Sequence, residues 1–445
     1  MQKRILISID HKWRDLPGYV YLGKLLEKQN YEVEYCRNGL EKFYIQGFQP
    51  HIVVINHLYD KNRQVYFNKV ASWGIKVVIL PTEGIPTLTK YREFAAGVKN
   101  DLSSVALHFL WNEPMKKVTL KNKSITEDKL KVIGVPRFDF YKEPLNKTLI
   151  SKTDFIKKYH LKEESPIITF ATNYTQAQFA TKNQEFFKND GKILGYDELL
   201  NEMEDEESIP QKDFKSRDLA VKAFIRLVKE FKDVNFVLKL HPSEDHSYYF
   251  NLLEDELKEY KSRCVVIIQE YIWDILNVTD IELKRSCTTG IESWILEHPT
   301  IEMKLNPNEW YHSQEHVVGS DIVTNYDELK LSVQQYLNGK AISNEKKLKR
   351  EEFIKIWCNG MKDNATSKVV SELNNLKVND VKVKKNFKQK CIYWILKYFN
   401  YALDDIRVYG FFGFLKGHNI DKLGRIDKHF HQEDIRYWDS RLDGF

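Results

Sequence analysis

The sequence predicts an α/β protein built from two consecutive domains, each with a parallel sheet, and two observations predict it. Over the first 145 residues, short apolar runs alternate with amphipathic stretches, which is typical of a parallel sheet covered by helices. After a polar stretch at 142–154, read as a linker, the same alternation begins again. Ligands of open α/β sheets bind at the carboxyl ends of the strands, so each domain is expected to carry its site there.

In the first half, three apolar runs are predicted to be buried strands: RILISI at 4–9, HIVVIN at 51–56 and KVVIL at 76–80. A helix is predicted over 18–29, because Leu22, Leu25 and Leu26 fall on one helical face and the turn residue Asn30 follows.

In the second half, four strands are predicted, at 166–172, 234–240, 264–268 and 300–304. Helices are predicted at 217–231, 271–278 and 291–297. Before the first of these helices lies an insertion of roughly forty residues that contains NEMEDEES. It is either a lid on the substrate side or, as its acidity favours, a surface loop.

Composition excludes several classes of protein. The net charge of +5 and pI of about 8.6 suit an anionic ligand or a membrane surface, but they are too weak to indicate nucleic-acid binding. Five scattered cysteines without a CxxC pair predict neither a disulfide framework nor a zinc site, and they fit a reducing cytoplasm. No apolar run reaches 18 residues, so no membrane span or signal peptide is expected.

The stretch KLHPSE at 239–244 ends a predicted buried strand with a histidine and a proline. A residue before proline is pushed into an extended conformation, so Pro242 would hold His241 at the carboxyl edge of the sheet. There His241 and Lys239 could neutralise phosphate charge on a leaving nucleotide. His-Pro also occurs by chance in many proteins, so the pair carries weight only beside other signals.

A second signal is RSCTTGIESW at 285–294. Ser286, Thr288 and Thr289 can present hydroxyls, and the helix that starts near Gly290 presents free N–H groups to an anion. Glu292 on its first turn could accept hydrogen bonds from ribose. Alternatively a threonine is only the helix N-cap and Glu292 its capping-box partner.

A third stretch, ATNYT at 171–175, follows the first strand of the second half. Thr172, Asn173 and Tyr174 are candidates for phosphate or acceptor contacts, and an ordinary strand-to-loop turn is the equal alternative.

Together these motifs resemble the donor half of bacterial surface-carbohydrate glycosyltransferases of GT-B architecture. The segment 10–35 is similar to the start of surface carbohydrate biosynthesis proteins, and IGVPRFDFY at 133–141 resembles the segment that closes their first domain. The resemblance covers roughly residues 3–375 in motif order, without close identity. EHPTIEMK at 297–304 departs from the small-residue and Gly-Pro pattern that relatives commonly carry.

The resemblance implies a GT-B-like α/β fold with two Rossmann-like domains facing across a cleft. It implies an acceptor domain at 1–145, a nucleotide-sugar donor domain at 160–340, helices at 341–376 packing back on the domains, and an aromatic and basic extension at 380–445. The donor is expected to be a CMP-sugar carrying a Kdo- or nonulosonic-acid-type sugar, and the acceptor a surface polysaccharide or lipid-linked glycan. Donor contacts are then expected from Lys239, Pro242, Ser286, Thr288, Thr289, Gly290, Glu292, Thr172 and Asn173, with His241 catalytic.

The resemblance also implies a general base in the first domain. Glu83 and Gly84 of PTEGIPT follow the strand KVVIL and are the best counterparts of the family's acidic-Gly motif. Thr82 stands where some relatives have a second acid, so the doublet is incomplete. Asp10 and Asp15 are the reserve candidates for the base, and acceptor contacts are expected from Asp10, Arg14 and Gly84. No DxD pair follows a strand, so neither a metal nor another cofactor is expected.

Three other functions stay open: a CDP-glycerol or CDP-ribitol glycerophosphotransferase, a UDP-sugar GT-B glycosyltransferase, and a non-enzymatic membrane scaffold. The aromatic and basic stretch at 391–419 is either an interfacial membrane surface or a structural extension. His429 and His431 match no metal-site spacing, and DKHFHQEDIRYWDSRL at 427–442 is interpreted as a polar surface or oligomer contact. The expected location is the cytoplasm, with or without contact to the inner face of the membrane.

Overall fold

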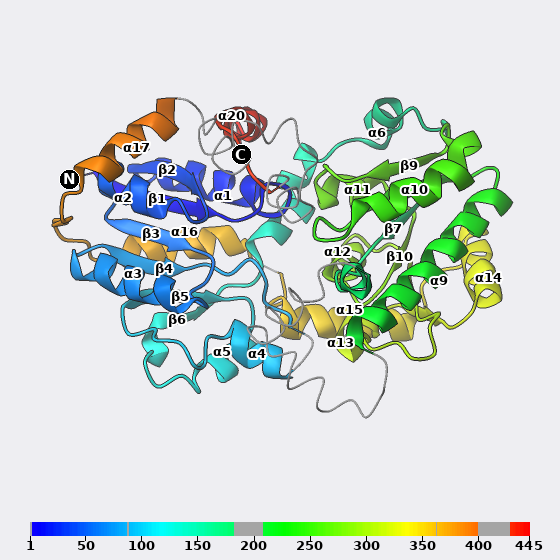
Figure 1. Cartoon of the computed structure of the whole chain (residues 1–445), viewed down its shortest axis with the longest axis horizontal. Helices are drawn as coiled ribbons and strands as arrows, with labels where there is room; N and C mark the ends of the chain where they lie inside the picture. The colour runs from blue at the N-terminus through cyan, green and yellow to red at the C-terminus, as the bar shows by residue number, and fades with distance from the viewer. Residues whose placement is uncertain (1, 87–88, 182–207, 362, 399–427) are drawn as a thin grey trace. The chain divides into compact units, whose positions relative to one another are not determined.

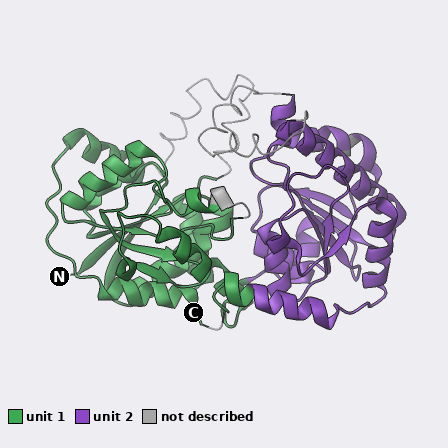
Figure 2. Cartoon of the chain, turned by 90° about the horizontal axis from the view of Figure 1, so that it is seen from below, with its two compact units in different colours: residues 1–148, 354–445 green, residues 149–353 purple. Residues whose placement is uncertain are grey.

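The computed structural model describes residues 2–86, 89–181, 208–361, 363–398 and 428–445 (Figure 1). The chain divides into two compact units, residues 1–148 with 354–445 and residues 149–353 (Figure 2). The division falls inside the polar stretch 142–154. None of the helices in the described ranges is long and apolar enough to cross a bilayer.

Within its described residues, unit 1 holds a six-stranded parallel sheet in the order β2-β1-β3-β4-β5-β6. Its strands are β1 (Lys3–Ile9), β2 (Tyr31–Arg37), β3 (Ile52–Ile55), β4 (Lys76–Ile79), β5 (Val105–Leu110) and β6 (Leu130–Val132). The helices between them are α1 (Lys12–Glu27), α2 (Glu41–Phe48), α3 (Lys61–Ser72), α4 (Thr89–Ala95) and α5 (Glu113–Thr119). The central strand β3 is apolar and buried along its length, and β4 is so from Val77 onward, because helices cover both faces of the sheet.

Unit 1 is completed by elements that come after β6. They are the 3₁₀ helices η1 (Glu127–Lys129), η2 (Pro136–Tyr141) and η3 (Leu145–Thr148), and the helices α16 (Ala365–Asn375), α17 (Phe387–Tyr398) and α20 (Gln432–Arg441). Helix α17 packs on α2, and both α16 and α20 pack on α1. Helix α15 (Asn344–Trp357) carries the chain from unit 2 into unit 1.

Unit 2 has a second parallel sheet, six-stranded over the described residues, in the order β12-β11-β10-β7-β8-β9. Its strands are β7 (Ile167–Ala171), β8 (Asn235–Lys239), β9 (Cys264–Ile267), β10 (Ile281–Lys284), β11 (Thr300–Met303) and β12 (Asp321–Val323). Its helices are α6 (Lys152–Tyr159), η4 (Ala177–Ala180), α9 (Ile209–Glu230), α10 (His246–Leu257), η5 (Lys258–Tyr260), α11 (Ile272–Val278), α12 (Thr288–Ile295), α13 (Gln314–Val317) and α14 (Tyr326–Leu337). With β7 as the first strand, β8 and β9 follow on one side and β10, β11 and β12 on the other, which is the strand order of a Rossmann fold.

Three predicted helices, α1, α9 and α12, start earlier in the structure than in the sequence prediction. Helix α1 begins at Lys12 because Nδ1 of His11 accepts the N–H of Trp13 and so caps the helix. Helix α9 begins at Ile209, where the Gln211 side chain accepts the N–H of Ser208 in a capping box. The first residues of α9 therefore belong to the end of the predicted insertion. The part of the insertion at 182–207 lies outside the described residues.

The segment read as a polar surface or oligomer contact packs on α1 through its apolar side chains, while Glu433, Arg436 and Ser440 of α20 are exposed. Trp438 of α20 is fully buried and meets the ring of Phe140 edge-on at 5.8 Å. Lys12 pairs with Asp434 at 2.7 Å, and the buried Arg37 donates to the carbonyl of Phe430 at 2.9 Å. The described end of the chain is therefore part of the packing of unit 1.

Candidate functional site

In the sheet of unit 1 the strand order reverses between β1 and β3, and polar residues gather at the carboxyl ends of the strands there. Strand β2 lies on one side of β1, and β3 to β6 follow on the other side. Ligands of open α/β sheets bind at such a switch point. Asp10 directly follows β1, and Glu83 follows β4 after a three-residue turn.

Arg14, on the first turn of α1, joins these side chains. Its guanidinium donates to Glu83 Oε1 at 2.8 Å, to Asp10 Oδ2 at 3.2 Å and to Thr82 Oγ1 at 3.0 Å. It also forms two bonds with Asp15, at 2.7 and 3.0 Å. Three predicted residues, Glu83, Asp10 and Arg14, are thus brought together.

The three carboxylates around Arg14 differ in environment. Burial raises the pKa of Asp15 above its usual range, and Arg14 only partly offsets this. Burial also opposes ionisation of Asp10, but Arg14 and the amide of Asn38 bring the pKa of Asp10 below its usual range. The Glu83 side chain is 63% exposed, so it is the carboxylate of this group best placed to meet a ligand.

The turn that carries Glu83 is held from both sides. Arg137 of η2 donates to the carbonyl of Thr82 at 2.8 Å, and Asn112 donates to the carbonyl of Gly84 at 2.8 Å. A Cβ at Gly84 would lie 2.5 Å from the ring of Trp111. The absence of a side chain at Gly84 therefore lets the turn pack against Trp111, and the Gly84 carbonyl is already hydrogen-bonded. The predicted acceptor contact from Gly84 stays a prediction.

A small cavity lies beside this turn, inside unit 1. Its volume is about 40 Å³, room for two or three water molecules. Arg14, Asp15 and Thr82 form one part of its lining, with Trp111 and Arg137 among the others. The cavity adjoins the edge where Glu83 is exposed.

Two further groups at this edge were missed from the sequence. His57, two residues after β3, stacks on Tyr59 at 4.2 Å, and burial together with Arg63 lowers the pKa of His57 to about 4. The imidazole is therefore uncharged at neutral pH. Lys428, whose carbonyl accepts the N–H of Lys12 at 2.8 Å, brings an ammonium group near Asp10. The strand-end rule that singled out Glu83 also applies to His57, whereas no local signal identifies Lys428.

In the sheet of unit 2 the strand order reverses between β7 and β10. Hydrogen bonds join the residues that follow β7 and β8 beside this switch point. The N–H of His241 donates to Thr172 Oγ1 at 2.9 Å, and the N–H of Thr172 donates to the carbonyl of Lys239 at 3.0 Å. Nδ1 of His241 accepts the N–H of Ser243 at 3.1 Å, in the turn that follows Pro242. The neutral ring then carries its proton on Nε2, as a donor suited to a phosphate oxygen.

Lys239 is placed differently from expectation. Its ammonium group is buried and donates to the carbonyls of Leu240 and Ile268, at the ends of β8 and β9. Lys239 therefore stabilises the strand ends in this structure, and direct phosphate contact by this residue stays a prediction.

The hydroxyl of Ser286 is likewise turned inward, and a donor contact from this residue stays a prediction. Ser286 is buried, and both its N–H and its hydroxyl donate to Glu302 of β11. Glu302 also pairs with Lys284 at 2.9 Å. Gly290 makes room for that lysine, because a Cβ there would lie 2.3 Å from Lys284 Cδ.

The predicted capping box of α12 is absent from the described structure. The N-cap is Cys287, without a side-chain cap bond, and the helix begins at Thr288. Glu292 is 1% exposed and so is closed to a ribose in this structure. Thr288 and Thr289 are both half-buried at the helix start.

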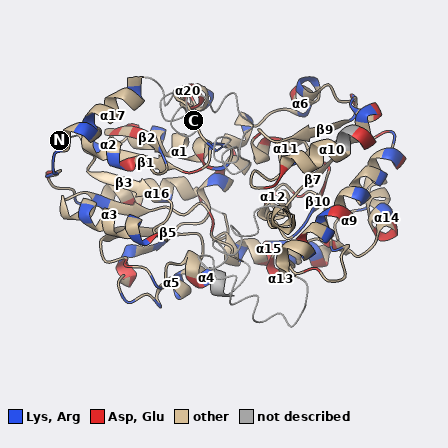
Figure 3. Cartoon of the chain, in the orientation of Figure 1, with Lys and Arg blue, Asp and Glu red and all other residues tan. Residues whose placement is uncertain are grey.

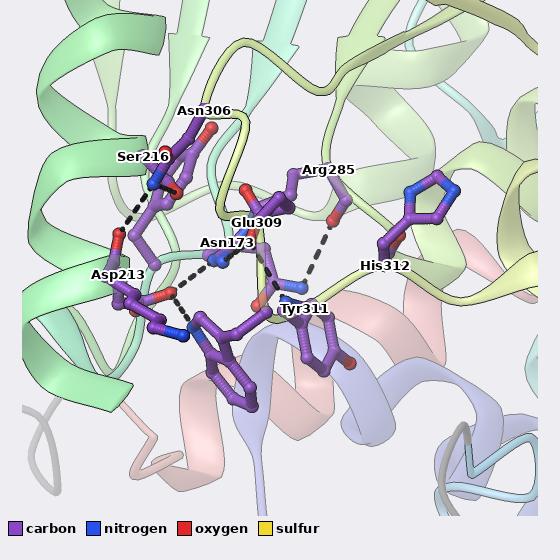
Figure 4. A network of polar contacts seen from close by, with 12 residues as sticks. Asn173, Asp213, Ser216, Arg285, Asn306, Glu309, Tyr311 and His312 are labelled. Carbon is purple, nitrogen blue, oxygen red and sulfur yellow. Dashed lines mark hydrogen bonds and ion pairs between the residues drawn. The ribbon is translucent and has the colours of Figure 1, made fainter. Parts of the chain in front are cut away.

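The centre of the unit 2 switch point is filled by Arg285 (Figure 4). This buried guanidinium pairs with Asp213 of α9 and with Glu309, and it donates to the carbonyl of Asn173 at 2.8 Å. Burial would lower the pKa of Arg285, but these two carboxylates raise it. The network was missed from the sequence because its members are far apart in the chain. Arg285 is therefore buried in this network, whereas Asn173, His241 and Thr288 are half-buried.

Glu83 and Asp10 belong to unit 1, and His241 and Asn173 belong to unit 2. Over the described residues, no group of three His, Cys, Asp or Glu side chains is arranged to hold a metal ion.

No family model and no curated protein matches the chain. Solved structures do match it. The wall teichoic acid polymerase TagF, in a crystal soaked with CDPG, is 12% identical with a TM-score of 0.52, covering 84% of this chain and 88% of that one. UDP-GlcNAc 2-epimerase from Neisseria meningitidis, bound to UDP-GlcNAc, is 15% identical with a TM-score of 0.51, covering 84% of this chain and 100% of that one. A putative UDP-N-acetylglucosamine 2-epimerase from Listeria monocytogenes is 10% identical with a TM-score of 0.51, covering 86% and 100%. At these identities the likeness shows the fold, and the predicted GT-B-like α/β fold with a helical C-terminal region is confirmed.

Proposed function

We propose that this chain is a glycosyltransferase that moves a sugar from a CMP-sugar donor to a surface polysaccharide or lipid-linked acceptor. The observation that carries the proposal is His241, held at the end of β8 beside the switch point of a Rossmann-ordered sheet, with Nδ1 bonded to Ser243. The fold supports it, because solved structures of this fold include a polymerase soaked with CDPG and an epimerase bound to UDP-GlcNAc.

Unit 2 would bind the donor. The Nε2–H of His241 donates to the phosphate of the nucleotide, and the start of α12 at Thr288 adds main-chain N–H groups with the positive end of its dipole. Both interactions strengthen as the phosphate takes up negative charge, so they stabilise the transition state more than the bound donor.

Unit 1 would bind the acceptor and supply the base. The acceptor hydroxyl gives its proton to Glu83, and its oxygen forms the new bond to the anomeric carbon. The bond from that carbon to the phosphate oxygen breaks, and its electron pair leaves with CMP. Asp10 and Arg14 orient the acceptor and hold Glu83.

The transferred sugar is proposed to be of the Kdo or nonulosonic-acid type. A lipid-linked acceptor would be met at the inner face of the cell membrane, where we place the enzyme.

The test begins with thermal unfolding of the full chain in the presence of CMP, CDP, UDP or GDP. A ligand that binds only the native state raises the unfolding temperature, and CMP is expected to raise it most. CMP release from CMP-sugars, with mass analysis of the product, then identifies the reaction. Protection by UDP or GDP but not by cytidine nucleotides would overturn the choice of donor.

Variants of His241 sharpen this test. In His241→Asn the amide takes the place of Nδ1 and keeps the Ser243 bond, but the donor at Nε2 is lost. His241→Gln places an amide N–H near Nε2 instead. We expect His241→Asn to lower the rate of transfer about a hundredfold or more, and His241→Gln to retain part of the lost rate. His160→Asn, at an exposed position in the left-handed region, is the matched control and should be neutral.

Two alternatives have a specific observation in their favour. The likeness to a polymerase soaked with CDPG favours a CDP-alditol phosphotransferase, which would yield a product containing an alditol phosphate. The likeness to an epimerase bound to UDP-GlcNAc favours a UDP-sugar enzyme, which would be protected by UDP.

A further inference from the structure

Helix α17 has two apolar faces, and the described residues of unit 1 cover only one of them. Tyr393 and Leu396 are buried against α2, where the Tyr393 ring meets Tyr44 edge-on at 5.3 Å. The fit is close, because a Cβ at Gly47 of α2 would lie 1.9 Å from the Tyr393 ring. This contact fixes which side of α17 faces outward.

The outward face is aromatic. Phe387 is 82% exposed and Tyr398 84%, the two largest values among the large apolar side chains of the described residues. Trp394 and Ile395 are exposed between them. Positions 387, 394, 395 and 398 fall on one stripe at 3.6 residues per turn, opposite Tyr393 and Leu396.

Lysines border this stripe. From Lys377 to Tyr398 the sequence has seven lysines and one acidic residue, Asp380. Lys384, Lys385, Lys388 and Lys390 are exposed, and the blue segments of α17 in Figure 3 mark the lysines on the helix. The nearby Glu34 is paired with Lys397 and bonded to the hydroxyl of Tyr393, so its charge is already compensated. We name the four exposed lysines and the four side chains of the stripe the α17 surface.

We propose that the α17 surface binds an anionic lipid bilayer, with α17 lying in the plane of the interface. Aromatic rings and an aliphatic side chain would enter the boundary of the acyl chains while the flanking lysines contact lipid phosphates. With 12 residues, α17 is too short to span the bilayer. The charge of the surface selects a negatively charged bilayer as its partner. This inference rests on α17 alone and does not depend on the proposed transferase activity.

The test is co-sedimentation of the full chain with phosphatidylcholine vesicles, with and without about 30% phosphatidylglycerol. We expect binding to the anionic vesicles only, weakened when salt is raised to about 0.5 M. Replacing Lys384, Lys385 and Lys388 together by Gln should lower the partition coefficient about a hundredfold, since each lysine near the surface contributes about a factor of five. Replacing Phe387, Trp394 and Tyr398 together by Ser should lower it at least about tenfold.

The matched control is Leu348→Ser on α15, which changes an exposed apolar residue that also lies between two lysines. It should bind vesicles like the unchanged protein. All variants alter exposed positions, so their unfolding temperatures should change little, and thermal unfolding of each variant checks this. Equal binding to neutral vesicles, no binding to either kind, or unchanged binding of both triple variants would overturn the proposal. A dimer that the Ser variant dissociates would overturn it too, because the stripe would then be a contact between two copies.

Discussion

Arg14 and Glu83 form an ion pair in which the guanidinium donates to Glu83 Oε1 over 2.8 Å. The pair links the first turn of α1 to the turn after β4, and Arg14 is itself held by Asp15. Because the Glu83 side chain is 63% exposed, its ion pair adds little stability. The pair instead orients a solvent-facing carboxylate at the switch point of the unit 1 sheet.

Glu83→Gln is therefore expected to separate activity from stability. If Glu83 is the base, the rate of transfer should fall about 10²- to 10⁴-fold. The free energy of unfolding should change by less than about 1 kcal/mol. Glu93→Gln is a matched control, because Glu93 pairs with Lys121 at 2.6 Å at another surface position of unit 1. Transfer by Glu83→Gln at the rate of the control would move the role of base to Asp10 or Asp15.

Glu244 predicts a dependence of stability on pH. It is buried after β8, accepts the N–H of Tyr174 at 2.7 Å, and burial raises its pKa to about 7. Between its ordinary value of 4.5 and 7 the unfolded chain gives up this proton before the folded one does. Stability contributed by Glu244 should therefore fall as pH rises through this range, by up to about 3 kcal/mol, and stay constant above it.

The measurement is urea unfolding of Glu244→Gln and the unchanged protein at several values from pH 4.5 to 8. The variant should gain stability relative to the unchanged protein as pH rises. Other buried groups act in both directions: the pKa of Glu282 is also raised to about 7, and that of His108 is lowered to about 4. Only the difference between the two proteins isolates Glu244, and a difference that does not change with pH would contradict the assignment.

Two glycines in helices predict opposite effects of the same substitution. In Gly290→Ala the new methyl group would lie 2.3 Å from Lys284, whose buried ammonium is bonded to Glu302 and to the carbonyl of His316. Moving that lysine disrupts a buried ion pair, so we expect a loss of about 2 kcal/mol or more. In Gly18→Ala the nearest atom lies at 3.9 Å, and the better helix propensity of alanine should add about 0.5–1 kcal/mol. Chemical denaturation of both variants checks the pair.

The buried strands with continuous apolar runs were predictable, because a parallel sheet covered on both faces has this pattern. The runs predicted for β1, β3, β4, β7, β8, β9 and β11 all form strands. The prediction did not include β2, whose sequence YEVEYCR carries two glutamates because it lies at the edge of its sheet. It also missed β5, β6, β12 and β10, and in β10 the buried Glu282 and Lys284 break the apolar pattern.

The positions of Glu83 and His241 were predictable because each residue follows one strand, and their roles stay predictions. The site was not predictable where long-range pairing decides the environment. Ser286 and Lys239 have the residue types that bind phosphate, yet Glu302 and the carbonyl of Ile268 occupy them in the folded chain. Those partners come from other strands of the sheet, and sequence spacing does not reveal them.

Two tryptophans near the end of the chain provide the last prediction. Trp438 is fully buried on α1 beside Phe140, whereas Trp394 is 48% exposed on α17. Trp438→Ala should lower the stability of unit 1 by about 3–5 kcal/mol, because it leaves a cavity under α20. Trp394→Ala should cost under about 1 kcal/mol, because most of its ring area is not lost from a core. Equal effects on the denaturation midpoint would mean that α20 does not pack on α1 in solution. Should Trp438→Ala instead change the oligomeric state at unchanged stability, the interpretation of this segment as a contact between subunits would be supported.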